Sequence, residues 1–90
     1  MVRPSPNDGD SLTVALQALA ISLGDEARAS RLLNLTGLTP DDLRHRASDP
    51  AVLVAVLRFL EDHEPDLLAV AETLGIRPQE LVAARIALEA

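Results

Sequence analysis

Glycine and proline divide this leucine-rich chain of 90 residues into short segments. Glycine is favoured just after the last turn of a helix, and proline is favoured in the first turn. The glycines that follow apolar stretches are Gly24, Gly37 and Gly75, and the prolines that open stretches are Pro40, Pro50, Pro65 and Pro78. This pattern predicts an all-α fold, a compact bundle of five to six short helices. The expected helices cover residues 11–23, 26–36, 40–47, 50–62, 65–74 and 78–90.

Two helix starts carry particularly clear signals. Thr39 precedes Pro40 and two aspartates, which predicts an N-cap followed by a first turn suited to the helix dipole. Asp49 gives the same signal before residues 50–62. Alternate valines from Val52 to Val56 would suit a strand, but nothing else in the chain offers a partner strand. A helix is therefore expected there as well.

The chain reads as one folded domain with a short polar extension. Residues 1–9 combine two prolines and a glycine with polar residues, so they are expected to form a disordered N-terminal arm. Residues 10–90 are expected to form a single helical domain. Asp10 or Ser11 should cap its first helix, and Gly24 should end that helix in the left-handed conformation.

Two segments of the chain resemble each other. Residues 37–43 (GLTPDDL) and residues 75–81 (GIRPQEL) share glycine, proline, acidic and leucine positions. Each segment predicts a corner of the helix-turn-helix kind between two helices. Duplication and convergence both remain open as the origin of this similarity.

Composition narrows the classes of function. The chain has no cysteine, which excludes disulfides, thiolate metal sites and a cysteine nucleophile. Phe59 is the only aromatic residue, and the net charge is -6. Nucleic acid is disfavoured as a partner, because binding to it depends on neutralising phosphates. No apolar segment resembles a signal peptide or a membrane span, which predicts a cytoplasmic protein without membrane contact.

The basic residues suggest one candidate interaction patch. Every basic residue is an arginine, and arginine is enriched at protein interfaces. The candidate patch contains Arg28, Arg31, Arg44, His45 and Arg46. The competing explanation for residues 44–46 is that cations in the last turn of a helix complement its dipole.

No catalytic or metal site is expected. Residues 61–66 form the densest group of potential metal ligands, but their spacing matches no calcium or zinc motif. His45 and His63 lie in polar stretches that predict exposed side chains, whereas a general base is usually partly desolvated. No glycine-rich phosphate loop occurs. The sequence therefore predicts a protein that is not an enzyme and needs no cofactor.

Residues 70–85 offer an alternative function. Their small and apolar positions around Gly75 fit the helix-turn-helix pattern of nucleic-acid-binding proteins. Arg77 and Arg85 could contact phosphates there, but Glu80 would oppose them. An ordinary corner between two helices explains the same pattern.

Several stretches resemble a known family. Residues 15–20 (ALQALA) and 35–44 (LTGLTPDDLR), followed by residues 59–61 and 67–69, are similar to small alphaproteobacterial proteins called domain of unknown function 3572. The resemblance covers about residues 11–88. It implies a stand-alone cytosolic helical protein and defines no functional residues. Genes of the family often lie near those of a response regulator and a diguanylate cyclase, so the resemblance also favours a signalling adaptor.

The leading hypothesis is a non-enzymatic helical module for protein-protein interaction. Two of the expected helices, residues 11–23 and 50–62, are apolar nearly all round, so part of their aliphatic surface should remain uncovered. Such a strip would contact a protein partner or a second copy of the chain. A signalling adaptor and a homo-oligomer are both allowed, with nucleic-acid binding through residues 70–85 as the alternative.

Overall fold

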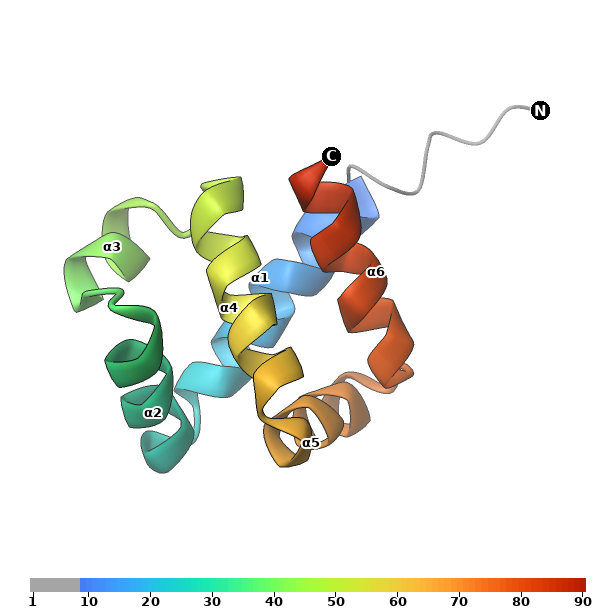
Figure 1. The fold of residues 1–90 in the computed structure, drawn as a ribbon, viewed down its shortest axis with the longest axis horizontal. Helices are drawn as coiled ribbons and strands as arrows, with labels where there is room; N and C mark the ends of the chain where they lie inside the picture. Colours follow the sequence, from blue (N-terminus) through green and yellow to red (C-terminus); the bar gives the residue numbers. More distant parts are fainter. Residues whose placement is uncertain (1–8) are drawn as a thin grey trace.

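The computed structural model describes residues 9–90, and this part of the chain is all-α with no strand (Figure 1). The fold class predicted from the sequence is confirmed. The helices are α1 (Gly9–Leu23), α2 (Glu26–Thr36), α3 (Pro40–His45), α4 (Pro50–Asp62), α5 (Glu64–Leu74) and α6 (Pro78–Glu89). Within the described residues, no helix is both long and apolar enough to span a membrane.

The predicted helix starts at Thr39 and Asp49 are confirmed. The Thr39 hydroxyl accepts the Asp42 N–H at 3.1 Å, and the Asp42 carboxylate accepts the Thr39 N–H at 2.9 Å. These reciprocal bonds form a capping box, which satisfies two backbone donors at the start of α3. Asp49 likewise accepts the Ala51 N–H at 2.9 Å at the start of α4. The alternate valines of α4 are helical because the Asp-Pro start outweighs their strand propensity.

The predictions for α1 were wrong at both of its ends. The helix begins at Gly9, so Asp10 and Ser11 lie in its first turn instead of capping it. The predicted disordered arm covered residues 1–9; Gly9 is instead the first residue of α1, and residues 1–8 lie outside the described residues. Gly24 does not adopt a positive φ; its N–H instead bonds to the Ile21 carbonyl at 3.1 Å. The chain then enters α2 through the Asp25 N-cap, whose carboxylate accepts the Arg28 N–H at 2.9 Å.

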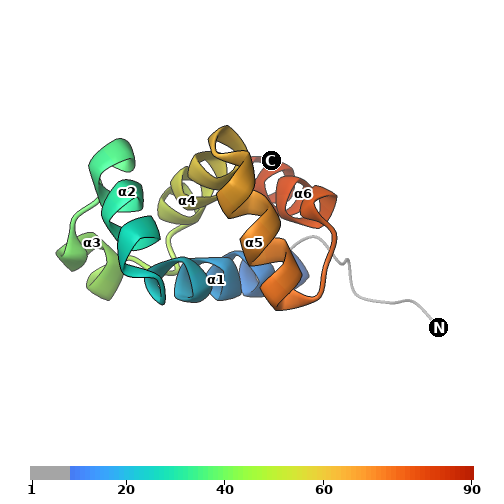
Figure 2. The same ribbon diagram turned by 90° about the horizontal axis from the view of Figure 1, so that it is seen from below.

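Helix α1 forms a base on which the other core helices lie. Seen from below, α1 runs along one side of the molecule, with α2, α4 and α6 on the other, and α5 crosses in front of α1 (Figure 2). Helix α1 contacts each of these four helices, and α4 occupies the centre between α2 and α6 (Figure 1). The six buried residues of α4 are Val52, Leu53, Val56, Leu57, Phe59 and Leu60. One hydrophobic core therefore unites α1, α2, α4, α5 and α6.

The two similar corners share a backbone conformation. Gly37 ends α2 with a φ of 76°, and Gly75 ends α5 with a φ of 72°. Both values lie in the left-handed region that glycine adopts without steric cost. The helices that follow differ: α6 buries Leu81 and Ala84, whereas α3 has no buried residue and lies at the edge of the molecule (Figure 1).

The large exposed apolar side chains do not form the strip expected on α1 and α4. Burial of α4 against its neighbours covers most of its apolar surface. The exposed large apolar residues of the described chain are Leu23 (α1), Leu35 (α2), Leu68 (α5) and Ile86 (α6). Leu35 is the most exposed, at 61%. It lies beside the cavity described next.

Candidate functional site

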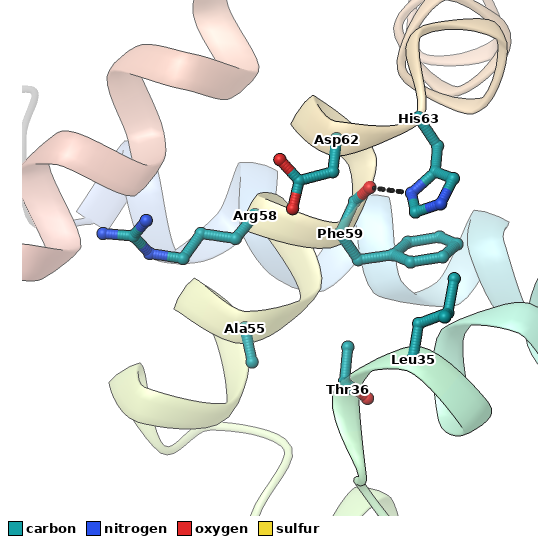
Figure 3. A pocket seen from close by; sticks show the side chains of 7 residues that line it. All are labelled: Leu35, Thr36, Ala55, Arg58, Phe59, Asp62 and His63. Atoms are coloured by element: carbon teal, nitrogen blue, oxygen red, sulfur yellow. Dashed lines mark hydrogen bonds between the residues drawn. The ribbon is translucent and has the colours of Figure 1, made fainter.

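A groove opens between α2 and α4, with a volume of about 230 Å³ (Figure 3). Two residues of α2 line one side, and α4 and the residue after it line the other. The lining residues are Leu35, Thr36, Ala55, Arg58, Phe59, Asp62 and His63. The floor is largely apolar, and the ionisable groups all come from α4 and His63.

Local packing explains why this space exists. Ala55 and Thr36 present small side chains from the two helices (Figure 3), so they leave a gap that leucine or methionine would fill. The Phe59 ring, 3% exposed, lies between Leu35 and His63 in the same view. Its centroid is 4.7 Å from the centroid of the His63 ring. The aromatic pair thus gives the groove a firm wall.

The ionisable groups of the groove are held in different ways. Arg58 reaches away toward α6 (Figure 3), where its guanidinium pairs with Glu89. His63 Nδ1 lies 2.8 Å from the Phe59 carbonyl oxygen, which can only accept a hydrogen bond. Nδ1 must therefore carry a proton, and in the neutral ring Nε2 is left as an acceptor. Among residues 9–90, Asp62 has no basic partner within ion-pair distance.

The sequence-based expectation of an exposed His63 was wrong. The residue is half-buried because its ring stacks on Phe59 and its Nδ1 bonds to the end of α4. Thr36 carries the hydroxyl among the lining residues and would be the candidate nucleophile. Its hydroxyl donates to the Leu32 carbonyl oxygen at 2.6 Å. Thr36 is thus engaged with its own helix and makes no hydrogen bond to His63. His45 is exposed, as expected.

Arg28 and Arg31 of the predicted patch converge on one carboxylate of α5. Arg28 Nε donates to Asp66 Oδ1 at 2.9 Å, and Arg31 Nη2 donates to both Asp66 oxygens at 2.7 and 2.8 Å. Asp66 is only 5% exposed. Burial alone would raise the pKa of its carboxyl, but the hydrogen bonds from Arg31 and Arg28 outweigh burial and lower that pKa. These two arginines therefore tie α2 to α5.

The other members of the patch lie at the opposite end of this region. Arg44, His45 and Arg46 lie at the end of α3, whereas Arg28 and Arg31 lie in the first turns of α2, away from α3 (Figure 1). Arg44 pairs with Asp41 at 2.5 Å. Arg46 pairs with Asp49 at 2.9 Å, which raises the pKa of its guanidinium through that hydrogen bond. The structure thus divides the five residues into two groups.

The acidic residues 61–66 do not converge. Glu61 pairs with Arg85 of α6, with Nε to Oε2 at 2.5 Å, and Asp66 points to α2. Within residues 9–90, no group of three or more histidine or acidic side chains is arranged to hold a metal ion.

Residues 70–85 include the α5–α6 corner, but its arginines differ in access. Arg85 is held by Glu61 and Glu89, and its side chain is 17% exposed. A phosphate would have to displace these two carboxylates. The Arg77 side chain is 81% exposed, and its Nε lies 4.0 Å from Glu80 Oε2. Helix α6 packs on α1 and α4 and buries Leu81 and Ala84, so only its outer face is accessible to a partner.

The α2–α4 groove was missed by the sequence analysis. Leu35 is an apolar residue of α2, for which burial would be the ordinary expectation, yet it is exposed. The available signal was a pair of small residues, Thr36 and Ala55, which becomes meaningful only when α2 is known to lie beside α4.

Comparison with known proteins gives one match. A search of the curated proteins and a search of the solved structures returned none. A family model described as "Protein of unknown function (DUF3572)" matches residues 9–90, which is the whole of the described helical part. The chain therefore belongs to the DUF3572 family, as its resemblance to that family predicted.

Proposed function

We propose that this protein is a cytoplasmic, non-enzymatic helical module that binds another protein through the α2–α4 groove. The observation that carries this proposal is an apolar cavity bounded by Phe59, with Leu35 61% exposed beside it. Exposed apolar side chains next to a preformed cavity are typical of protein contacts.

The size and lining of the groove support a protein side chain as its occupant. Its volume of about 230 Å³ is below the roughly 300–1,000 Å³ of typical small-molecule sites. An aliphatic side chain needs a firm apolar wall, which Phe59, Ala55 and Leu35 supply.

The ionisable side chains also favour binding over catalysis. Catalysis by a histidine needs a proton acceptor or donor poised on a reacting group and a partner that orients it. His63 Nδ1 is bonded to a backbone carbonyl, and the Thr36 hydroxyl is bonded within α2. Neither group is placed to activate the other.

Affinity capture with matched surface variants tests the proposal. The bait is the full chain in three forms: unchanged, Leu35→Glu, and the control Ile86→Glu, whose site on α6 is 56% exposed. Both substitutions fall on exposed side chains, so far-ultraviolet circular dichroism should show unchanged folding. A protein bound through the groove should be retained by the unchanged chain and by Ile86→Glu and lost from Leu35→Glu.

Equal capture by both variants would contradict the groove as the docking surface. Sedimentation of the purified chain measures its oligomeric state and so tests self-association. A dimer that dissociates in Leu35→Glu but not in Ile86→Glu would identify a second copy as the occupant.

A further inference from the structure

We infer that the α2–α4 groove accepts a basic amphipathic helix of another protein, with one aliphatic side chain in the cavity and an arginine or lysine beside Asp62. This inference rests on the proposed function and adds the chemistry of the partner. It follows from how charge is distributed over residues 9–90 and around the groove.

The arginines of the described chain are all engaged by its own carboxylates. Each of them, from Arg28 to Arg85, has a carboxylate oxygen within 4.0 Å. The acidic residues without such a partner among residues 9–90 are Asp10, Asp25, Glu26, Asp62, Glu64 and Glu72. The charge left for an approaching partner is therefore negative, which attracts a basic surface and repels an acidic one.

The same imbalance occurs at the groove itself. Asp62 lines the groove and is exposed, as is Glu64, two residues further along the chain. Arg58, the only cation of the lining, is directed to Glu89 on α6. The groove thus combines an apolar floor with the Asp62 carboxylate at the end of α4, which is turned away from the His63 ring (Figure 3). A partner with an aliphatic residue and a cationic N–H donor one helical turn apart matches both features.

A second copy of the chain fits this surface less well. Two copies would each bring a net charge of -6 and the same unpaired carboxylates to the contact. Like charges across an interface oppose association. The observed charge therefore favours a different, basic chain.

Titration with designed peptides tests the inference. Three synthetic amphipathic peptides share one leucine face and differ only in the flanking residues, which are arginine, glutamine or glutamate. The full chain, labelled with ¹⁵N, is titrated with each at low salt. The arginine peptide should bind most tightly and shift the amide signals of Leu35, Ala55 and Asp62.

Two variants locate the contacts. Ala55→Leu fills the cavity and should weaken binding of the arginine peptide at least about tenfold, as for a central interface residue. The matched control Ala83→Leu, on the exposed side of α6, should leave binding unchanged. Asp62→Asn should weaken the arginine peptide about two- to fivefold and leave the glutamine peptide unchanged, since exposed ion pairs contribute modestly.

The outcomes separate the two proposals. Equal binding of all three peptides at the groove overturns the basic partner and leaves the groove as a docking surface. Shifts confined to other helices, or no binding by any peptide, overturn the inference. If the inference is overturned in this way, capture of a protein that is lost from Leu35→Glu but not from Ile86→Glu would still support the proposed function.

Discussion

Replacing Asp66 by asparagine should destabilise the fold by about 2–3 kcal/mol. The substitution removes the charge that holds Arg28 and Arg31, and breaking one side of a buried ion pair costs about 3–5 kcal/mol. Arg31 is half-exposed and can return to water, which places the expected loss at or below the lower end of that range. Since a domain of this size shifts by about 4–8 °C per kcal/mol, the melting temperature should fall by at least about 8 °C.

The dependence of this loss on pH identifies its cause. The pKa of Asp66 is lowered in the folded chain, so its stabilising contribution is complete above the usual value of 3.8. The contribution disappears as the pH falls through the lower folded-state value. The stability difference between the unchanged chain and Asp66→Asn should therefore be largest above about pH 4. It should shrink toward zero as the pH falls below that value.

Chemical denaturation followed by circular dichroism measures both effects, because the chain has no tryptophan or tyrosine for fluorescence. Arg44→Ala is the control: its pair with Asp41 is well exposed, and exposed pairs contribute about 0–1 kcal/mol. If Asp66→Asn costs no more than Arg44→Ala, or its cost is the same at every pH, the Arg28–Asp66–Arg31 cluster does not stabilise the fold as described.

Further predictions concern the core, a corner and a cap. Leu57→Ala, at a fully buried site of α4, should lower the free energy of unfolding by about 2–5 kcal/mol in the same assay; a loss below 1 kcal/mol would contradict the central place of α4. Gly75→Ala should cost about 1–2 kcal/mol because its φ is 72°, and Gly75→Asn should cost less; equal costs would refute a conformational cause. Thr39→Ala should cost about 0.5–2 kcal/mol through loss of the capping box, and an unchanged unfolding midpoint would count against that role.

The number and placement of the helices were predictable because their signals are local. Thr39 and Asp49 bond to backbone N–H groups two or three residues away, so the relevant partners are already adjacent in the chain. Gly24 shows where such reasoning is insufficient. A glycine after an apolar helix allows a positive φ but does not require it, and here the Asp25 cap provides the turn instead.

The candidate site was far less accessible from the sequence. The predicted patch grouped arginines by type, but Arg28 and Arg31 are directed to Asp66, a residue far along the chain. His63 was expected to be exposed because its sequence neighbours are polar, whereas its stacking on Phe59 half-buries it. Contacts between distant segments decide which charges remain free, and sequence spacing does not report them.

By itself, the sequence determined an all-α chain of six short helices, its family and the absence of thiol chemistry. Only the tertiary structure decided that α2 lies beside α4, that Thr36 and Ala55 leave a cavity there, and that Asp62 remains without a cationic partner among residues 9–90. The physical reason is range. Helix starts and ends depend on hydrogen bonds within one turn, whereas a groove depends on how side chains from separate helices fill the space between them.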